Sequence, residues 1–207
     1  GAGKTTAVQL LGRYWDVSSG TIKIGGVPVT ELQTENLSDL TAFVFQDVFL
    51  LEDTLLENIR MGTDATEEQV RQAAKAAQID DFIMSLPKGY ATRIGDEGVK
   101  LSGGQQQRIS IARAILKDAP IVVFDEATSY SDIENEHKIQ LALQNLLRGK
   151  TTSMIGHRLH TIRNADKIFV FQDGKVVEQG THDELIASGS TYSHMWDTYT
   201  RETIGEE

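Results

Sequence analysis

The chain opens with a stretch that could bind phosphate, Gly1-Ala2-Gly3-Lys4-Thr5-Thr6. Gly3, Lys4 and Thr5 match the closing G-K-[ST] of the phosphate-binding loop G-x-x-x-x-G-K-[ST]. In such a loop, glycine lets backbone N–H groups turn toward phosphate oxygens, lysine neutralises the β- and γ-phosphates, and the threonine hydroxyl ligates Mg²⁺. A helix that begins near Thr5 would add its positive N-terminal end, and Thr6 would hold a phosphate nearer the sugar. A match of three residues recurs by chance, so an ordinary helix start is the alternative interpretation.

Polar side chains that could do chemistry also follow apolar, strand-like runs. Residues 41–45 run into Gln46, residues 121–124 into Asp125 and Glu126, and residues 151–155 through Gly156 into His157. In an open parallel α/β sheet, ligands bind beyond the carboxyl ends of the strands, so we expect these side chains on the edge that carries the phosphate loop. Each also has a plainer interpretation. The two acids could start a helix, Gln46 could be an ordinary loop residue, and His157 could be a hydrogen-bonded histidine with no role in chemistry.

A third candidate is the sequence Leu101-Ser102-Gly103-Gly104-Gln105, which precedes a helical pattern. Ser102 is a favourable N-cap, and the two glycines would let the phosphate of a second molecule approach the helix amides. The apolar positions Ile109, Ala112, Ile115 and Leu116 are predicted to fall on one side of this helix. The alternative is a capped helix with a flexible lead-in.

The remaining patterns predict the elements that must position these residues. We expect a helix that begins near Thr5, includes the run from Ala7 to Trp15 and is ended by Ser18-Ser19-Gly20. We also expect hairpins over residues 21–29 and 168–178, and a helical segment from 53 to 86 with a capping box at Thr66-Glu67-Glu68-Gln69. Further helices are predicted over 133–147, after Thr181 and from Thr191, the last with Trp196 on one face. The predicted fold is α/β and P-loop NTPase-like, a mostly parallel sheet flanked by helices, in a single domain over 1–207. Residues 1–51 and 119–207 form its core, and 52–118 form an inserted helical subdomain.

Composition narrows the class of protein. The chain has 207 residues, 40% of them hydrophobic, a formal net charge of −10 and no cysteine. The negative charge opposes nonspecific binding to nucleic acid or anionic lipid, and disulfides and thiolate metal sites are excluded. No apolar run approaches the roughly 20 residues of a membrane span, so we expect a soluble chain that meets a membrane through a protein partner. Because a phosphate loop needs a preceding buried strand, we also expect missing N-terminal strands in an upstream segment.

Taken in order, these motifs resemble the nucleotide-binding domain of an ATP-binding cassette (ABC) transporter. The resemblance covers a truncated Walker A at Gly1 to Thr6, a Q-loop at Gln46, the signature Leu101 to Gln105, a Walker B from Ile121 to Asp125 with Glu126, a D-loop from Ser129 to Asp132, and a switch histidine at His157. It spans nearly the whole chain. The signature followed by a Walker B is its most specific part.

The resemblance implies a role for each residue. Residues Gly1 to Thr6 would bind the phosphates of ATP, and Mg²⁺ would be held by Thr5, Gln46 and, through water, Asp125. Glu126 would be the general base or position the attacking water, Gln46 would contact that water, and His157 would hydrogen-bond the γ-phosphate. Ser102, Gly103, Gly104 and Gln105 would complete the site of an opposite subunit in a head-to-tail dimer with two ATP molecules. The other histidines, His137, His160, His182 and His194, are predicted to be surface residues.

Two departures from the family pattern limit the resemblance. The D-loop has Tyr130 and Ser131 where small and apolar residues are usual, which puts communication between the two sites in doubt. The aromatic residue that stacks on adenine lies upstream of Walker A in the family, so none is assigned here. Residues 93–98 and 49–59 resemble the exporter type, in which the cassette is commonly fused behind a transmembrane domain. This implies ATP-driven transport, a place at the cytoplasmic face of a membrane, and no nucleic-acid partner.

The sequence leaves two other functions open. A soluble ABC ATPase of DNA repair or translation usually carries coiled-coil or zinc insertions or basic arms, and the sequence has no heptad array, no cysteine and a net negative charge. A nucleotide-binding regulatory module that does not hydrolyse ATP typically lacks the carboxylate at the position of Glu126, which is present here.

Overall fold

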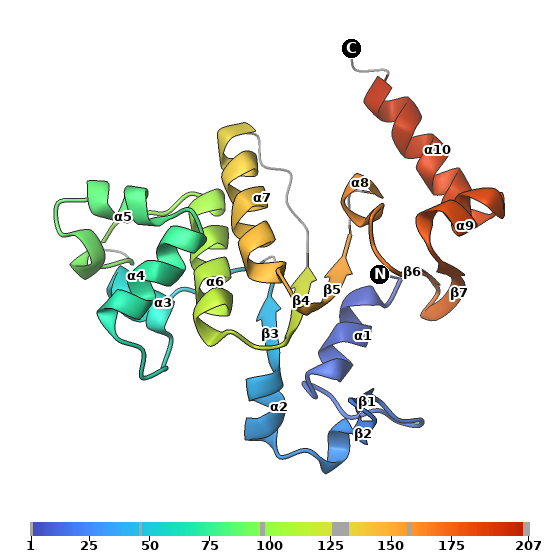
Figure 1. The fold of residues 1–207 in the computed structure, drawn as a ribbon, viewed down its shortest axis with the longest axis horizontal. Helices are drawn as coiled ribbons and strands as arrows, with labels where there is room; N and C mark the ends of the chain where they lie inside the picture. Colours follow the sequence, from blue (N-terminus) through green and yellow to red (C-terminus); the bar gives the residue numbers. More distant parts are fainter. Residues whose placement is uncertain (1, 46, 96–97, 126–132, 157–158, 205–207) are drawn as a thin grey trace. The chain divides into compact units, whose positions relative to one another are not determined.

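The computed structural model describes residues 2–45, 47–95, 98–125, 133–156 and 159–204. The chain divides into two compact units, one made of Gly1–Val29 with Met154–Glu207 and the other of Thr30–Ser153. Each unit is described by itself below, with its elements labelled in Figure 1. The predicted division into a core and a helical subdomain at residues 52–118 remains a prediction.

A three-stranded sheet in the order β3-β4-β5 lies at the centre of the Thr30–Ser153 unit. Its strands are β3 (Thr41–Val44), β4 (Ile121–Asp125) and β5 (Thr151–Ile155), the last of which continues into the other unit. β3 and β4 are parallel, with Thr41 opposite Ile121 and Val44 opposite Phe124. Val44, Val122 and Val123 are buried, as expected for a parallel strand covered on both faces. The predicted strands over 41–45, 121–124 and 151–155 are confirmed.

Helices make up most of the rest of this unit. They are α2 (Thr34–Leu40), α3 (Leu55–Arg60), α4 (Glu67–Ala76), α5 (Asp80–Ser85), α6 (Gly103–Lys117) and α7 (Ile133–Leu147), with 3-10 turns at Val29–Glu31 and Gly89–Ala91. The predicted capping box of α4 is confirmed, because Thr66 and Gln69 bond each other's backbone N–H groups. Helix α6 packs against α3, α4, α7 and β3. Ile109 and Ala112 on the predicted apolar side of α6 are buried, and Gln107, Arg108 and Ile111 are buried as well, because several elements pack against the helix.

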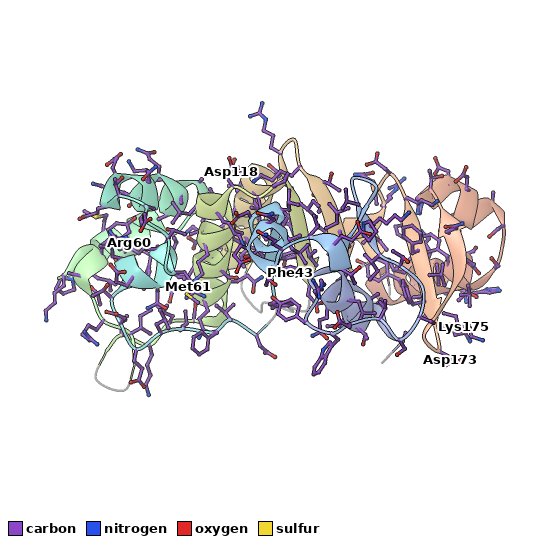
Figure 2. All side chains as sticks on the ribbon, turned by 90° about the horizontal axis from the view of Figure 1, so that it is seen from below. Phe43, Arg60, Met61, Asp118, Asp173 and Lys175 are labelled. Atoms are coloured by element: carbon purple, nitrogen blue, oxygen red, sulfur yellow. The ribbon has the colours of Figure 1, made fainter. Side chains whose placement is uncertain are left out.

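The other unit combines the two ends of the sequence. Its elements are α1 (Lys4–Leu11), β1 (Lys23–Ile24), β2 (Val27–Pro28), α8 (Leu159–Ile162), β6 (Ile168–Gln172), β7 (Lys175–Gly180), α9 (His182–Ala187) and α10 (Thr191–Ile204). Both predicted hairpins are confirmed as antiparallel pairs, β1 with β2 and β6 with β7. Asp173 and Gly174 connect β6 to β7 with φ values of 49° and 75°, as a two-residue hairpin turn requires. Figure 2 labels Asp173 and Lys175 at this turn.

Helix α1 ends earlier than predicted. Gly12 caps it, Arg13 follows in the left-handed region with φ 52°, and the Arg13 and Tyr14 N–H groups donate back to Leu10 and Gln9. This is a Schellman ending, which satisfies the last carbonyl groups of the helix and stops it. Tyr14 and Trp15, predicted to continue the helix, lie beyond its end and are 54% and 67% exposed.

Helix α10 is held to the β6–β7 hairpin by a side-chain cap. The Glu178 carboxylate on β7 accepts hydrogen bonds from the backbone N–H groups of Thr191 (2.7 Å) and Tyr192 (3.0 Å). Desolvation tends to raise the pKa of Glu178, but hydrogen bonds from Ser190, Tyr192 and Thr191 outweigh it and leave that pKa below its ordinary value. Tyr192 then packs with Ile168, Val170 and Leu185 in the small core of this unit, and Trp196 covers that core.

Candidate functional site

The start of α1 has the local geometry of a phosphate-binding turn. Gly3 precedes the helix with φ 92°, a conformation that favours glycine, and it has no side chain to cap the first turn. A Cβ on Gly3 would lie 3.3 Å from the Cα of Gly174, so the close approach also requires glycine. The Ala2 carbonyl accepts a hydrogen bond from the Gly174 N–H group (3.2 Å). The N–H groups of an uncapped first turn favour an anion, and Lys4 is the first residue of that turn.

Asp125 occupies the predicted position at the end of β4. It is only 9% exposed, and the register of β3 with β4 brings the ends of these two strands to the same edge. A buried carboxylate at a strand end suits a metal-binding or catalytic role better than an exposed helix cap does. Lys4 and Asp125 belong to different compact units, so their convergence on one ligand remains a prediction.

Several predicted site residues lie outside the part of the chain that the structure describes. They are Gly1, Gln46, Glu126 and His157, together with the D-loop residues 129–132. Their roles stay as predicted from the sequence.

The signature segment begins α6 with a complete capping box. The Ser102 hydroxyl accepts a hydrogen bond from the Gln105 N–H group (3.3 Å), and the Gln105 side chain accepts one from the Ser102 N–H group (2.9 Å). The prediction that Ser102 is an N-cap is therefore confirmed. Ser102 and Gly103 are exposed, which leaves this helix start accessible to a second molecule.

Gly104 has a packing role that the sequence alone did not reveal. It is buried, and a Cβ at this position would lie 3.2 Å from the Cβ and Cγ atoms of Asn135 on α7. The Asn135 side chain in turn accepts a hydrogen bond from Arg108, which is 3% exposed (2.9 Å). Glycine at 104 therefore allows α6 to pack closely against α7.

A partly buried hydrogen-bond network links α6 to the segment that follows Gln46. Arg113 of α6 donates hydrogen bonds to the carbonyl groups of Asn58 (2.5 Å) and Phe49 (2.6 Å) and to the Asn58 side-chain oxygen (3.0 Å). Burial lowers the pKa of Arg113 to about 10. Neither residue was predicted as a functional candidate, although the polar Asn58 lies between the apolar positions Leu55 and Ile59.

Part of the 93–98 loop folds back on residues 52–54. The Ile94 N–H group donates to the Asp53 carbonyl (2.9 Å), and the Arg93 guanidinium donates to the Glu52 carbonyl (2.9 Å). The segment borders an open cavity of about 590 Å³, which Glu52, Lys88, Arg93 and Val99 help to line. Nearby in the sequence, the Phe49 side chain is 67% exposed.

One of the histidines predicted to lie on the surface does not. His182 is half-buried, its Nδ1 atom lies 2.9 Å from the Tyr192 hydroxyl, and its ring meets Trp196 edge-on with centroids 4.5 Å apart. The prediction was wrong because α10 folds back on α9, a contact that local sequence does not encode. His137 and His194 are exposed as predicted, and the side chain of His160 is outside the described part.

Comparison with known protein families decides what these motifs belong to. The family model described as "ABC transporter" matches residues 1–129, which is more than half of the chain. The chain belongs to the ABC transporter family. ATP is therefore the ligand expected of this ABC domain, and the uncapped α1 turn at Gly3 and Lys4 fits its phosphates.

Individual relatives agree with this assignment. The ABC domain is 50% identical over 208 residues to an ATP-dependent lipid A-core flippase of Legionella pneumophila (strain Paris), covering 100% of this chain and 35% of that protein. It is 47% identical to an ATP-dependent lipid A-core flippase of Burkholderia orbicola (strain AU 1054), covering 94% of this chain and 33% of that protein. The chain thus spans about a third of the length of these relatives.

A solved structure gives the fold. The structure of a bacterial Atm1-family ABC exporter with ATP bound superposes with a TM-score of 0.86 at 41% identity, covering 95% of this chain and 35% of that one. The ABC domain therefore has the predicted P-loop NTPase-like α/β fold. Among the residues that the structure describes, no helix is both long and apolar enough to cross a lipid bilayer.

Proposed function

We propose that this ABC domain binds and hydrolyses Mg²⁺-ATP and that hydrolysis drives export of a substrate across a membrane. The observation that carries this proposal is the match to the ABC transporter family together with Gly3 and Lys4 at an uncapped helix start. The relatives described above are a flippase and an exporter, and neither is a DNA-repair or translation factor. The soluble and regulatory alternatives therefore have no support from them.

The chain's own residues divide the chemistry of phosphoryl transfer. Lys4 and the first N–H groups of α1 would neutralise the β- and γ-phosphates, which matters because charge neutralisation and positioning dominate this reaction. Thr5 and Asp125 offer hard oxygen ligands of the kind Mg²⁺ prefers, with Gln46 as a third. The metal would supply further charge neutralisation at the phosphates. Glu126 would accept a proton from the attacking water or orient it, and His157 would donate a hydrogen bond to the γ-phosphate.

The signature segment would act on the ATP of a second ABC domain. Ser102 and Gly103 are exposed at the start of α6, so N–H groups and a hydroxyl are available to a phosphate from outside. Two copies arranged head to tail would bury two ATP molecules, each held by α1 of one copy and α6 of the other. Closure would follow ATP binding, and release would follow hydrolysis.

A transmembrane domain would dock on the helical side of the domain. The length of the relatives supports a transmembrane domain in the same polypeptide, which would place this ABC domain at the cytoplasmic face of the membrane. Exposed Phe49 and the cavity beside Arg93 offer apolar and charged contacts for helices of that domain. Specificity for a cargo would lie in the transmembrane domain, so no substrate class is proposed.

The test uses the full-length protein reconstituted in lipid, with phosphate release from Mg²⁺-ATP as the measurement. We expect steady-state hydrolysis by the native protein and a loss of at least about 100-fold in Lys4→Ala, because the lysine neutralises transition-state charge. Lys23→Ala on β1 removes an exposed lysine of the same unit and serves as the matched control. No hydrolysis by the native protein, or equal hydrolysis by both variants, would overturn the proposal.

A further inference from the structure

Arg113 joins two segments that the proposed mechanism treats separately. It lies on α6, the helix that starts with the signature, and it holds the backbone of Phe49, three residues after Gln46. Its guanidinium donates hydrogen bonds to two carbonyl groups (2.5 and 2.6 Å) and to one side-chain oxygen (3.0 Å). The planar, forked guanidinium can reach all three acceptors at once, which a lysine ammonium on a single flexible stem cannot do.

Asn58 extends this contact to the whole segment before α3. Its side chain is fully buried, accepts a hydrogen bond from the Leu51 N–H group (2.8 Å) and donates to the carbonyl groups of Leu51 (3.0 Å) and Thr54 (3.0 Å). The same Asn58 oxygen also accepts from Arg113. Residues 49–54 and α3 are thus hydrogen-bonded to one guanidinium on α6, either directly or through the Asn58 side chain.

The position of Arg113 along α6 makes the link mechanical. Ser102 precedes it by eleven residues, which is about 16 Å at the rise of an α-helix. An α-helix transmits a displacement along its axis with little internal change because its backbone hydrogen bonds resist stretching. A displacement of the Phe49 segment would therefore move the signature at the far end of α6.

We propose that Arg113, which is hydrogen-bonded to Asn58, is a positioning residue that couples the segment after Gln46 to the signature. This inference rests on the proposed function, since it concerns when the signature reaches the opposite ATP. The role proposed for Arg113 is not to bind nucleotide. It makes the position of the signature depend on the position of Phe49, the exposed residue at which a transmembrane domain would push.

The experiment compares Arg113→Lys and Arg113→Met with the native full-length protein in lipid nanodiscs. Four quantities are measured. They are the unfolding midpoint, the Kd for Mg²⁺-ATP, the kcat for hydrolysis, and the protection from hydrogen exchange that Mg²⁺-ATP induces in residues 4–11 and in residues 102–107. Arg60→Met is the matched control, because Arg60 (labelled in Figure 2) also donates to a backbone carbonyl, that of Ala65 (2.9 Å), from the neighbouring helix α3.

We expect the lysine variant to bind Mg²⁺-ATP with native Kd and to protect residues 4–11 fully, because the acceptors that hold Arg113 lie at Phe49 and Asn58. Its kcat should fall about tenfold or more and protection of residues 102–107 should be lost, as expected when a reacting group is misplaced by about 1 Å. Arg60→Met should leave both unchanged. If Arg113→Met fails to fold, the lysine variant alone decides, since it keeps the cation and the aliphatic stem.

Two results would overturn the inference. In one, Arg113→Lys keeps native kcat and native protection at residues 102–107. In the other, kcat falls but protection at residues 4–11 and 102–107 falls equally, which indicates loss of stability alone. Absence of hydrolysis in the native protein would instead contradict the proposed function, so the two failures are distinguishable.

Discussion

Replacing Gly104 with alanine tests whether close packing, rather than phosphate access alone, requires glycine in the signature. The new Cβ would lie 3.2 Å from Asn135, a few tenths of an ångström too close, so the asparagine must move. We expect this movement to break the 2.9 Å hydrogen bond from Arg108. A bond from a charged donor contributes about 1.5–3 kcal/mol, and alanine regains up to about 1 kcal/mol of helix propensity. We therefore expect the free energy of local unfolding of α6 to fall by about 0.5–2 kcal/mol.

Hydrogen exchange in the full-length protein without nucleotide measures this loss directly. Protection of α6 amides should fall about 2- to 30-fold in Gly104→Ala, since about 1.4 kcal/mol corresponds to a factor of ten. In the Asn135→Gly background the Cβ and Cγ atoms that the new methyl group would meet are absent, so the same substitution should cost little. An equal loss in both backgrounds would refute the packing explanation, because a double-mutant cycle isolates the contact between the two side chains.

Three further substitutions test contacts described above. The pKa of Glu178 is lowered in the folded protein. The stabilisation of α10 by this carboxylate is therefore present above the ordinary pKa of 4.5 and is lost as the pH falls through the lower pKa of the folded state. Glu178→Gln should remove this acid dependence from the hydrogen-exchange protection of α10. Tyr192→Phe should cost about 1 kcal/mol by losing the bond to His182, seen as a lower unfolding midpoint at neutral pH. Tyr90→Phe removes a buried 2.7 Å hydrogen bond to Asp80 and should cost about 1.5–3 kcal/mol in chemical denaturation. An unchanged midpoint in either tyrosine variant would contradict the contact assigned to it.

Local signals in the sequence predicted most of the fold. The capping residues Thr66, Ser102 and Thr181 each begin a helix, because a cap satisfies backbone groups within three residues and needs no tertiary partner. Buried strands were recognisable for the same kind of reason, since the continuous run of β-branched and aromatic residues at 121–124 is typical of a strand buried on both faces. The end of α1 was missed because Gly12 and Arg13 stop the helix before the apolar pattern stops.

Contacts between distant segments were not predictable in this way. Arg113 and Asn58 are 55 residues apart, and His182 acquires its partners only when α10 folds back. A single sequence contains no signal for such pairs, because the chemistry of each residue is also compatible with a surface position. The candidate site is intermediate: its residue types follow from the motifs, whereas the packing of Gly104 on Asn135 required coordinates.

The most direct test of ATP hydrolysis by this domain is Glu126→Gln in the full-length protein. Equilibrium binding of Mg²⁺-ATP and steady-state release of phosphate are measured on the same preparation. We predict native affinity with turnover reduced by at least about 100-fold, as expected when a general base is removed from an intact binding site. Native turnover in this variant would contradict the assignment of Glu126 and the hydrolytic mechanism built on it.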